Sequence, residues 1–343
     1  TSRMGPMSLP TTALLIASAS IGCNSQTPVS TSGPPPTATG ASPPHQRLHI
    51  GYFKGIYEPR PESWQDLLAD AGRLRADNIN SVTISPPVLI SQRAGKRPRI
   101  ILEGEAAAAA DAMAAAHREG FAVHLSLTTS SPDLSPRVDP IGPVLNQLSE
   151  DTLRWAAAAE EEKVEIFTPL SDYNLVLGTE AAAAWSENIV PRIREKYSGL
   201  LAAKVIPDTG EPPPPGTPHG FEQLSYRGYD YLMLDILPQG ATFDPDAFNI
   251  YAGEVLQRAA LVAQRDGLKG IMVGEFGGWR EPAGVATVDG PVLGAEGQAA
   301  MVEQFLKLAM PQTAGAFYLG WTLPGRGAKG YPVEEALKKG FGT

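Results

Sequence analysis

Hydrophobic residues along the chain fall into two alternating patterns, short apolar runs and longer stretches with helical periodicity. Several runs are apolar at successive positions, which is typical of strands buried on both faces of a parallel sheet. The stretches between them repeat apolar residues every three or four positions, as amphipathic helices do. Eight strands are predicted, at residues 48–53, 80–85, 121–127, 164–168, 200–206, 230–236, 269–275 and 315–321. Helices are predicted at 64–74, 104–119, 143–162, 179–197, 245–266, 296–310 and 333–340, with only a short one at 221–225.

This alternation predicts a single (β/α)8 TIM barrel over residues 47–343. Strands that alternate with helical crossovers form parallel sheets, and eight such units are the number that closes this barrel. A doubly wound open sheet is the alternative. In a TIM barrel, function lies at the C-terminal ends of the strands, so the residues there are the candidates for chemistry.

The first 46 residues have a different pattern. Residues 14–22 form a short apolar run that ends at Cys23, the one cysteine of the chain. A run of this length suits the core of a signal peptide and is too short to span a bilayer. Because Gly22-Cys23 resembles the lipobox of bacterial lipoproteins, we expect residues 1–23 to direct export and Cys23 to carry a lipid. The protein would then be anchored in a membrane, at the cell surface or in the periplasm. An ordinary cleaved signal peptide is the alternative.

Composition separates a linker from the domain and excludes some functions. Residues 24–46 consist mostly of Ser, Thr, Pro and Gly, with almost no charged or large apolar side chains, which predicts a flexible linker. The formal charge of −9 argues against nucleic acid as a partner, because binding it needs a basic face. The five histidines form no metal-binding motif and Cys23 has no cysteine partner, so neither a metal nor another cofactor is expected.

Two carboxylates follow predicted strands on opposite sides of the barrel. Glu275 closes the apolar run 270–274, and a charge at the end of a buried strand is unfavourable unless it is paired or used. Asp172 follows the fourth strand. Strands four and seven face each other across a barrel, so the two side chains can bracket a glycosidic bond. The competing interpretations are a structural ion pair for Glu275 and a helix N-cap or turn residue for Asp172.

Other residues near predicted strand ends are candidates for substrate binding or for different chemistry. Flat aromatic faces could stack on a sugar ring and polar groups could bind its hydroxyls, although packing at the barrel rim is the alternative for the aromatic residues. The substrate-binding candidates are Tyr52, Ser171, Tyr173, Asn174, Asp235, Trp279, Arg280 and Trp321. A second chemistry is also open, in which Lys204 forms a Schiff base as in aldolase-type barrels and Gly277-Gly278 binds phosphate.

Six short stretches then suggest a family. They are Asn80–Thr83, Val164–Phe167, Trp185 with Arg192–Gly199, Tyr229–Leu232, Gly274–Gly277 and Gly315–Trp321. Their order and spacing resemble clan A of the glycoside hydrolases, and within it the β-mannanase-like family 113, over most of residues 48–325. The resemblance implies a retaining glycoside hydrolase that acts on a β-linked mannan or glucan. It also implies Glu275 as nucleophile, Asp172 as acid/base and Trp321 as the floor of the adjoining sugar subsite.

Three positions depart from the family pattern. Asp172 stands where the family has a glutamate, and Ser171 stands where many members carry an asparagine that binds the sugar 2-hydroxyl. Leu237 falls near the position of a strand-six tyrosine that contacts the nucleophile, while Asp235 occupies a nearby strand end. These departures favour the alternative function, a carbohydrate-binding surface lipoprotein on a barrel whose catalytic pair has decayed.

Overall fold

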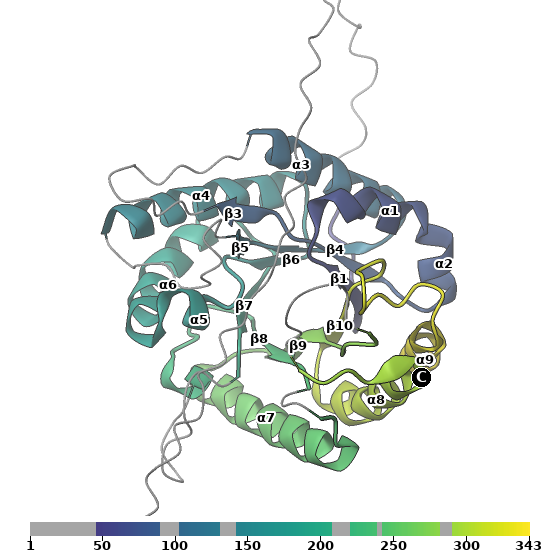
Figure 1. The fold of residues 1–343 in the computed structure, drawn as a ribbon. Coiled ribbons are helices and arrows are strands. Elements are labelled where there is room, and N and C mark those ends of the chain that lie inside the picture. Colours follow the sequence, from purple (N-terminus) through teal and green to yellow (C-terminus); the bar gives the residue numbers. More distant parts are fainter. Residues whose placement is uncertain (1–45, 90–102, 131–141, 208–219, 239–241, 282–289) are drawn as a thin grey trace, which may run out of the picture.

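Eight parallel strands close into a barrel with helices packed around it (Figure 1). The computed structural model describes residues 46–89, 103–130, 142–207, 220–238, 242–281 and 290–343. The strands follow each other around the barrel in chain order, from β1 through β2, β4, β6, β7, β8 and β9 to β10, which pairs with β1. This closure confirms the predicted TIM barrel and excludes an open sheet. The predicted signal segment, Cys23 and the linker up to residue 45 lie outside the described residues.

The element bounds are as follows. The barrel strands are β1 (Phe53–Glu58), β2 (Ser81–Ile84), β4 (Ala122–Ser126), β6 (Ile166–Thr168), β7 (Leu200–Val205), β8 (Tyr231–Ile236), β9 (Gly270–Phe276) and β10 (Gly315–Leu319). The helices are α1 (Trp64–Ala69), α2 (Ala71–Ala76), α3 (Glu103–Arg118), α4 (Gly142–Glu161), α5 (Tyr173–Leu177), α6 (Thr179–Arg194), α7 (Pro245–Asp266), α8 (Gly294–Ala309) and α9 (Pro332–Phe341). Short 3-10 turns are η1 (Pro61–Ser63), η2 (Gly220–Gln223) and η3 (Met310–Gln312). Beyond β2 and β4, a small parallel sheet pairs β3 (Pro87–Leu89) with β5 (Thr128–Ser130). Within the described ranges, no helix is both long and apolar enough to cross a membrane.

The first barrel strand lies five residues later than predicted. Strand β1 begins at Phe53, whereas the apolar run suggested a strand over 48–53. Leu48 is 37% exposed, and its N–H donates to the Glu165 carboxylate instead of to a neighbouring strand. The other seven barrel strands agree with prediction to within two residues. As a result, Tyr52 lies at the N-terminal end of the barrel, where its hydroxyl bonds to Thr313 at 2.9 Å.

The interior of the barrel has two layers of different character. The layer near the strand beginnings is apolar and contains Phe53, Ala122, Ile166, Ala202, Met233, Met272 and Phe317. Alternate residues of a strand point to the same face, so the next inward positions form a second layer nearer the C-terminal mouth. That upper layer is polar and includes Tyr57, His124, Thr168, Lys204 and Asp235. Barrel interiors are usually filled with branched apolar side chains, so the polar layer singles out this end as the candidate site.

One extra residue in β9 turns Glu275 into this upper layer. Leu234 of β8 pairs with Val273, but the next residue, Asp235, pairs with Glu275, which leaves Gly274 as a bulge. Bulges re-aim side chains and are frequent beside active sites. A Cβ at position 274 would lie 2.7 Å from Asp235 Oδ1 and 3.0 Å from Lys204 Cε. Glycine is therefore the residue that lets β9 approach these two side chains.

Candidate active site

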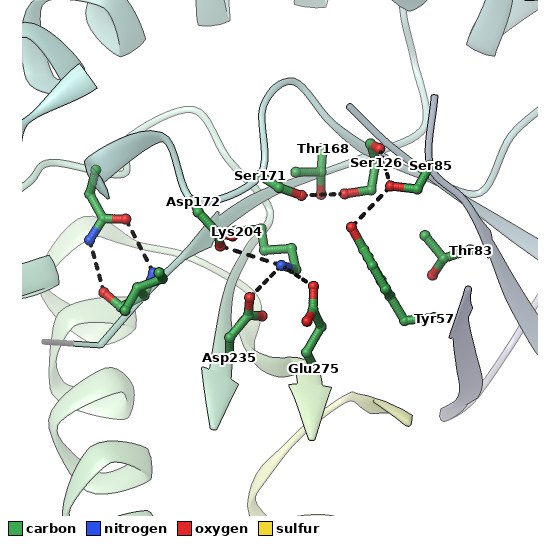
Figure 2. A network of polar contacts seen from close by, with 12 residues as sticks. Tyr57, Thr83, Ser85, Ser126, Thr168, Ser171, Asp172, Lys204, Asp235 and Glu275 are labelled. Atoms are coloured by element: carbon green, nitrogen blue, oxygen red, sulfur yellow. Dashed lines mark hydrogen bonds and ion pairs between the residues drawn. The ribbon is translucent and has the colours of Figure 1, made fainter. Parts of the chain in front are cut away.

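A buried lysine lies among three carboxylates at the C-terminal mouth of the barrel (Figure 2). The Nζ atom of Lys204 is 2.5 Å from Asp235 Oδ2, 2.8 Å from Glu275 Oε1 and 3.4 Å from Asp172 Oδ1. We call these four residues the carboxylate–lysine cluster. The structure thus brings Asp172 and Glu275 together, as predicted, and adds Asp235 as their neighbour. Lys204, which the sequence suggested only for a different chemistry, is the centre of the arrangement.

The chain after β6 holds Asp172 in an unusual backbone conformation. Asp172 has φ 54° and ψ 31°, the left-handed region, which is uncommon outside glycine and is enriched at functional sites. Its N–H donates to the carbonyl of Lys204 at 3.0 Å, which ties this loop to the end of β7. The residue occupies the N-cap position of α5, yet its side chain makes no capping hydrogen bond. The carboxylate is directed toward Lys204 instead, so the N-cap interpretation does not explain it.

The charges of the cluster do not balance, because one ammonium serves three carboxylates. Burial alone would lower the pKa of Lys204, but Asp172, Asp235 and Glu275 together raise it well above its ordinary value. Burial, and then repulsion by Glu275, raise the pKa of Asp235 well above its usual range. Burial also raises the pKa of Glu275, and the Lys204 ammonium offsets part of that rise. The cluster therefore retains a proton at a pH at which isolated carboxyls are ionised.

These charges disfavour the Schiff-base chemistry considered for Lys204. An amine must be neutral to attack a carbonyl group, and enzymes usually achieve this by burying the lysine away from anions or beside another cation. Lys204 is buried but has three carboxylate partners, which hold its proton. Its side chain is also fully covered by its neighbours. Lys204 is thus suited to act as a fixed positive charge.

A row of hydroxyl groups lines the mouth beside the carboxylates (Figure 2), and the imidazole of His124 bonds to two of them. This hydroxyl row consists of Tyr57, Thr83, Ser85, His124, Ser126, Thr168 and Ser171, joined in pairs by hydrogen bonds of 2.7–3.1 Å. Burial lowers the pKa of His124 to about 3 and raises that of Tyr57 to about 12, so both are neutral at ordinary pH. The Tyr57 ring centroid is 5.0 Å from Lys204 Nζ. The mouth therefore has an ionised side and a neutral, hydrogen-bonding side.

Solved glycoside hydrolases have the same barrel. A GH113 β-1,4-mannanase superimposes with a TM-score of 0.66 at 13% identity, covering 86% of this chain and 100% of that one. The two proteins share the barrel fold. The GH113 β-mannanase AaManA from Alicyclobacillus acidocaldarius, in complex with ManMIm, gives a TM-score of 0.62 at 17% identity, covering 85% of this chain and 98% of that one. A GH5_18 protein from Bifidobacterium longum subsp. infantis gives 0.58 at 15% identity, covering 87% and 79%.

No family model matches the sequence, and no curated protein matches it either. At identities this low the structural likeness establishes the fold and leaves the activity to the site itself. The resemblance noted in the sequence is thereby confirmed for the architecture.

Two of the predicted sugar-binding residues belong to the core instead. Tyr173 is 1% exposed and packs beside Trp185, with ring centroids 6.1 Å apart. Asn174 is buried, and its amide accepts from the Ile206 N–H at 3.1 Å and donates to the Ile206 carbonyl at 2.8 Å. The short helix α5 turns both side chains inward, which the loop prediction did not foresee. Asn174 fastens the chain that follows Asp172 to the chain that follows β7.

Trp321 is another correction, because its ring has no exposed face. It follows β10 at the C-terminal end, as expected, but it is fully buried and its indole N–H donates to Asp70 Oδ2 at 2.7 Å. The buried Glu58 carboxylate, at the end of β1, accepts the backbone N–H groups of Trp321 and Thr322 at 3.0 and 3.2 Å. These bonds hold the segment against the barrel wall. Tyr52, at the opposite end of the barrel, is likewise excluded from the site.

Trp279 and Arg280 join the segments that follow β9 and β10. The Arg280 guanidinium lies 3.3 Å from the Tyr331 ring centroid, and that of Arg326 lies 4.0 Å from the Trp279 ring centroid. Arg280 also donates to the Gly327 carbonyl at 2.9 Å. It borders a cavity of about 400 Å³ whose other lining residues include Thr322, Lys329, Tyr331 and Trp321, the last of which is itself fully buried. No member of the carboxylate–lysine cluster lines this cavity, so the cavity and the cluster share no residue.

Proposed function

We propose that this protein is a retaining glycoside hydrolase in which Glu275 is the nucleophile and Asp172 is the acid/base. The observation that carries the proposal is their shared contact with one ammonium nitrogen. The two distances, 3.4 and 2.8 Å, together limit the Asp172 Oδ1–Glu275 Oε1 separation to about 6.2 Å at most. Retaining enzymes hold their carboxyls roughly 5–5.5 Å apart, whereas inverting enzymes need roughly 6.5–9.5 Å to admit a water.

The two residues have the exposure that these roles require. The Asp172 and Glu275 side chains are 18% and 14% exposed, whereas Asp235 is 8% exposed and Lys204 is fully covered. A substrate at the mouth would therefore meet Asp172 and Glu275 before the other two. In the first step Glu275 attacks the anomeric carbon while Asp172 donates its proton to the departing glycosidic oxygen. In the second step Asp172 removes a proton from water, which displaces Glu275 and releases the sugar.

The substrate class we propose is a β-linked mannan or glucan. The GH113 proteins that share the barrel are named as β-1,4-mannanase or β-mannanase, and the mannan part of the proposal is taken from those names. Neutral hydroxyls beside the carboxylates, with Ser171 bonded to Ser126 at 2.7 Å, suit an uncharged sugar better than an acidic one. Of the predicted binding residues, Ser171, Trp279 and Arg280 remain candidates for contacts with it.

One observation favours the second candidate, a non-catalytic carbohydrate-binding protein. Lys204 forms an ion pair with Glu275 Oε1 and also contacts Asp172. Ion pairs of this kind can hold carboxylates in place, whereas catalysis requires them to reach the substrate. The catalytic proposal requires that Glu275 attack through its other oxygen. The two candidates differ in whether a covalent bond forms.

Covalent trapping tests the choice. The full chain is incubated with 2-deoxy-2-fluoro-β-mannosyl and β-glucosyl fluorides, which form glycosyl-enzymes that hydrolyse slowly, and its intact mass is measured. We expect an added fluorosugar on Glu275, located by peptide mapping. The adduct should be absent from Glu275→Gln and present in Glu254→Gln, a control on the exposed face of α7. If no adduct or hydrolysis occurs but a mannan or glucan oligosaccharide binds in calorimetry, the binding function replaces the catalytic one.

We also propose export and lipid anchoring through Cys23, as the sequence suggests. Such an enzyme would meet polysaccharide outside the cytosol, where a flexible linker would let the barrel reach it. Expression in a bacterial host with a clickable fatty acid should label the wild-type protein. Equal labelling of Cys23→Ala would remove the anchor from the proposal.

A further inference from the structure

The three carboxylates around Lys204 are graded in distance and exposure. Asp235 is closest to Nζ and least exposed, Glu275 is intermediate, and Asp172 is farthest and most exposed. The pull of the ammonium on a carboxylate falls with distance and with contact to water. Lys204 therefore offsets part of the effect of burial, which disfavours the ionised forms of Asp235 and Glu275.

Lys204 is a permanent positive charge in direct contact with Glu275, at 2.8 Å. The other groups that act on this part of the mouth are Asp172, Asp235, Tyr57, His124 and Arg326. Tyr57 and His124 are neutral over the range in which carboxyls titrate, and arginine keeps its charge throughout. Lys204 therefore sets the electrostatic field in which Asp235 and Glu275 ionise.

The backbone is arranged to admit this lysine. Lys204 occupies an inward position of β7, two residues beyond Ala202 of the apolar layer. The Gly274 bulge leaves the space that Lys204 Cε and Asp235 Oδ1 occupy, and the same bulge turns Glu275 toward Nζ. The contact between Lys204 and Glu275 thus depends on strand β7, on the register of β8 with β9 and on Gly274.

We propose that Lys204 is a positioning residue that favours the ionised form of Glu275 against the effect of burial and orients it through one oxygen, and that Asp235 moderates this effect by sharing the ammonium. The catalytic role of Lys204 rests on the proposed function. The interaction between Lys204 and Glu275 can be measured without any catalytic turnover. Lys204 binds Glu275 through Oε1, so Oε2 is the oxygen left to attack. Asp235 competes for the same ammonium and adds a like charge near Glu275.

The proposal predicts shifts of opposite sign for two neighbouring substitutions. Lys204→Met removes the cation, so the pKa of Glu275 should rise by about 1–3 units. Asp235→Asn removes a competing anion and leaves the ammonium to Glu275 and Asp172, so the pKa of Glu275 should fall. A purely structural salt bridge would lower the stability of both variants and would leave kcat/KM of the folded enzyme at the wild-type value.

Two readouts on the full chain test this. The first is the acidic limb of kcat/KM against pH for an aryl β-glycoside that the wild type cleaves. The second is the titration of the Glu275 carboxyl by ¹³C NMR, in protein labelled at the glutamate δ-carbon, with Glu275→Gln identifying the resonance. Lys196→Met, an exposed lysine just past the end of α6, is the matched control and should change neither. If Lys204→Met fails to fold, the double variant Lys204→Met/Asp235→Asn takes its place, because it carries one buried charge fewer than Lys204→Met. The pKa of Glu275 should still be raised in this double variant.

The outcomes separate the inference from the proposed function. Opposite shifts in both readouts support both. Opposite shifts by NMR without hydrolysis of any glycoside keep the role of Lys204 in the ionisation of Glu275 and remove the hydrolase proposal. In a third outcome the protein hydrolyses a glycoside, but the two variants leave both readouts unchanged or shift them in the same direction. That result overturns the inference and leaves the hydrolase proposal standing.

Discussion

The lower and upper layers of the barrel interior are built from the same strands but differ in character: the lower layer is apolar and the upper layer contains charged side chains. In the lower layer, Met233 and Met272 are fully buried among other apolar side chains, an arrangement that stabilises the fold by removing hydrocarbon from water. Two or three residues farther along the same strands, Asp235 and Glu275 are gathered around one ammonium. Buried charges that outnumber their partners destabilise a fold. The comparison indicates that the lower layer stabilises a barrel whose upper layer is organised for chemistry.

The sharpest test of this difference substitutes one β9 residue of the upper layer and, separately, one of the lower layer. Glu275→Gln should abolish hydrolysis, because an amide cannot form the glycosyl-enzyme, while stability is kept or raised by the loss of a buried negative charge. Met272→Ala should do the reverse. It should lower the free energy of unfolding by about 2–5 kcal/mol and leave kcat/KM of the folded protein within a few-fold of wild type.

Urea unfolding and hydrolysis assays on the same preparations decide this. The m-value should stay constant for both variants, so that a change in midpoint reports a change in stability. A Glu275→Gln variant that loses several kcal/mol, or a Met272→Ala variant that folds normally but is inactive, would contradict the division between the layers.

The next largest effect concerns the proton that the upper layer supplies. Asp172→Ala should slow hydrolysis of substrates with poor leaving groups by about 10²–10⁴-fold, the usual contribution of a general acid. Activated aryl glycosides, whose leaving groups need little protonation, should lose much less. Rates across a series of leaving groups measure this difference. Asp111→Asn, an exposed change on α3, serves as the control. An equal loss for all leaving groups would assign Asp172 to positioning instead of proton transfer.

The architecture could be predicted from the sequence because burial on both faces makes strands visible as apolar runs. The beginning of β1 could not, since Leu48 and Ile50 extend the apolar pattern although they precede the strand. In the site, Glu275 was identified because a charge at the end of a buried run is conspicuous. Asp172 was found from its place after the fourth strand.

The wrong predictions of sugar-binding residues have one physical cause. Tyr173, Asn174 and Trp321 follow strand ends in the sequence, but the direction of a side chain after a strand depends on the loop that follows. Lys204 offered a usable signal, because it continues the inward alternation of Leu200 and Ala202, and a lysine at such a position must have buried partners. Which carboxylates pair with it depends on the Gly274 bulge, which no local pattern reveals.

That bulge is itself open to test. Gly274→Ala would place a methyl group 2.7 Å from Asp235 Oδ1, so β9 or the cluster must move. A displacement of about 1 Å in a catalytic group can reduce turnover about 10²-fold, and we expect a loss of that order. Gly253→Ala on α7, where an added Cβ meets nothing within 4 Å, should keep activity and gain up to about 1 kcal/mol of stability. Unchanged turnover in Gly274→Ala would mean that the bulge does not set the position of Glu275.

The smallest expected effect extends the comparison to carboxylates at the other end of the barrel. Glu160, at the end of α4, accepts the Ser198 N–H at 2.9 Å and pairs with Arg47 and Lys163. Although burial opposes it, these hydrogen bonds and cations lower the pKa of Glu160 from its ordinary 4.5 to about 2. A lowered folded-state pKa adds stability above pH 4.5, which is lost as the pH falls toward 2.

Glu160→Gln should therefore reduce stability at pH 7 and flatten its decline between pH 4.5 and pH 2. The difference should be about 1 kcal/mol or less, because the Glu160 side chain is 30% exposed and water screens its pairs. Urea midpoints at several pH values measure it, with Glu161→Gln, the exposed neighbour, as the control. Asp235→Asn should act in the opposite sense, because a carboxyl with a raised pKa destabilises the fold once it ionises. If both variants changed the pH dependence of stability in the same direction, the contrast between satisfied carboxylates at one end and crowded ones at the other would be wrong.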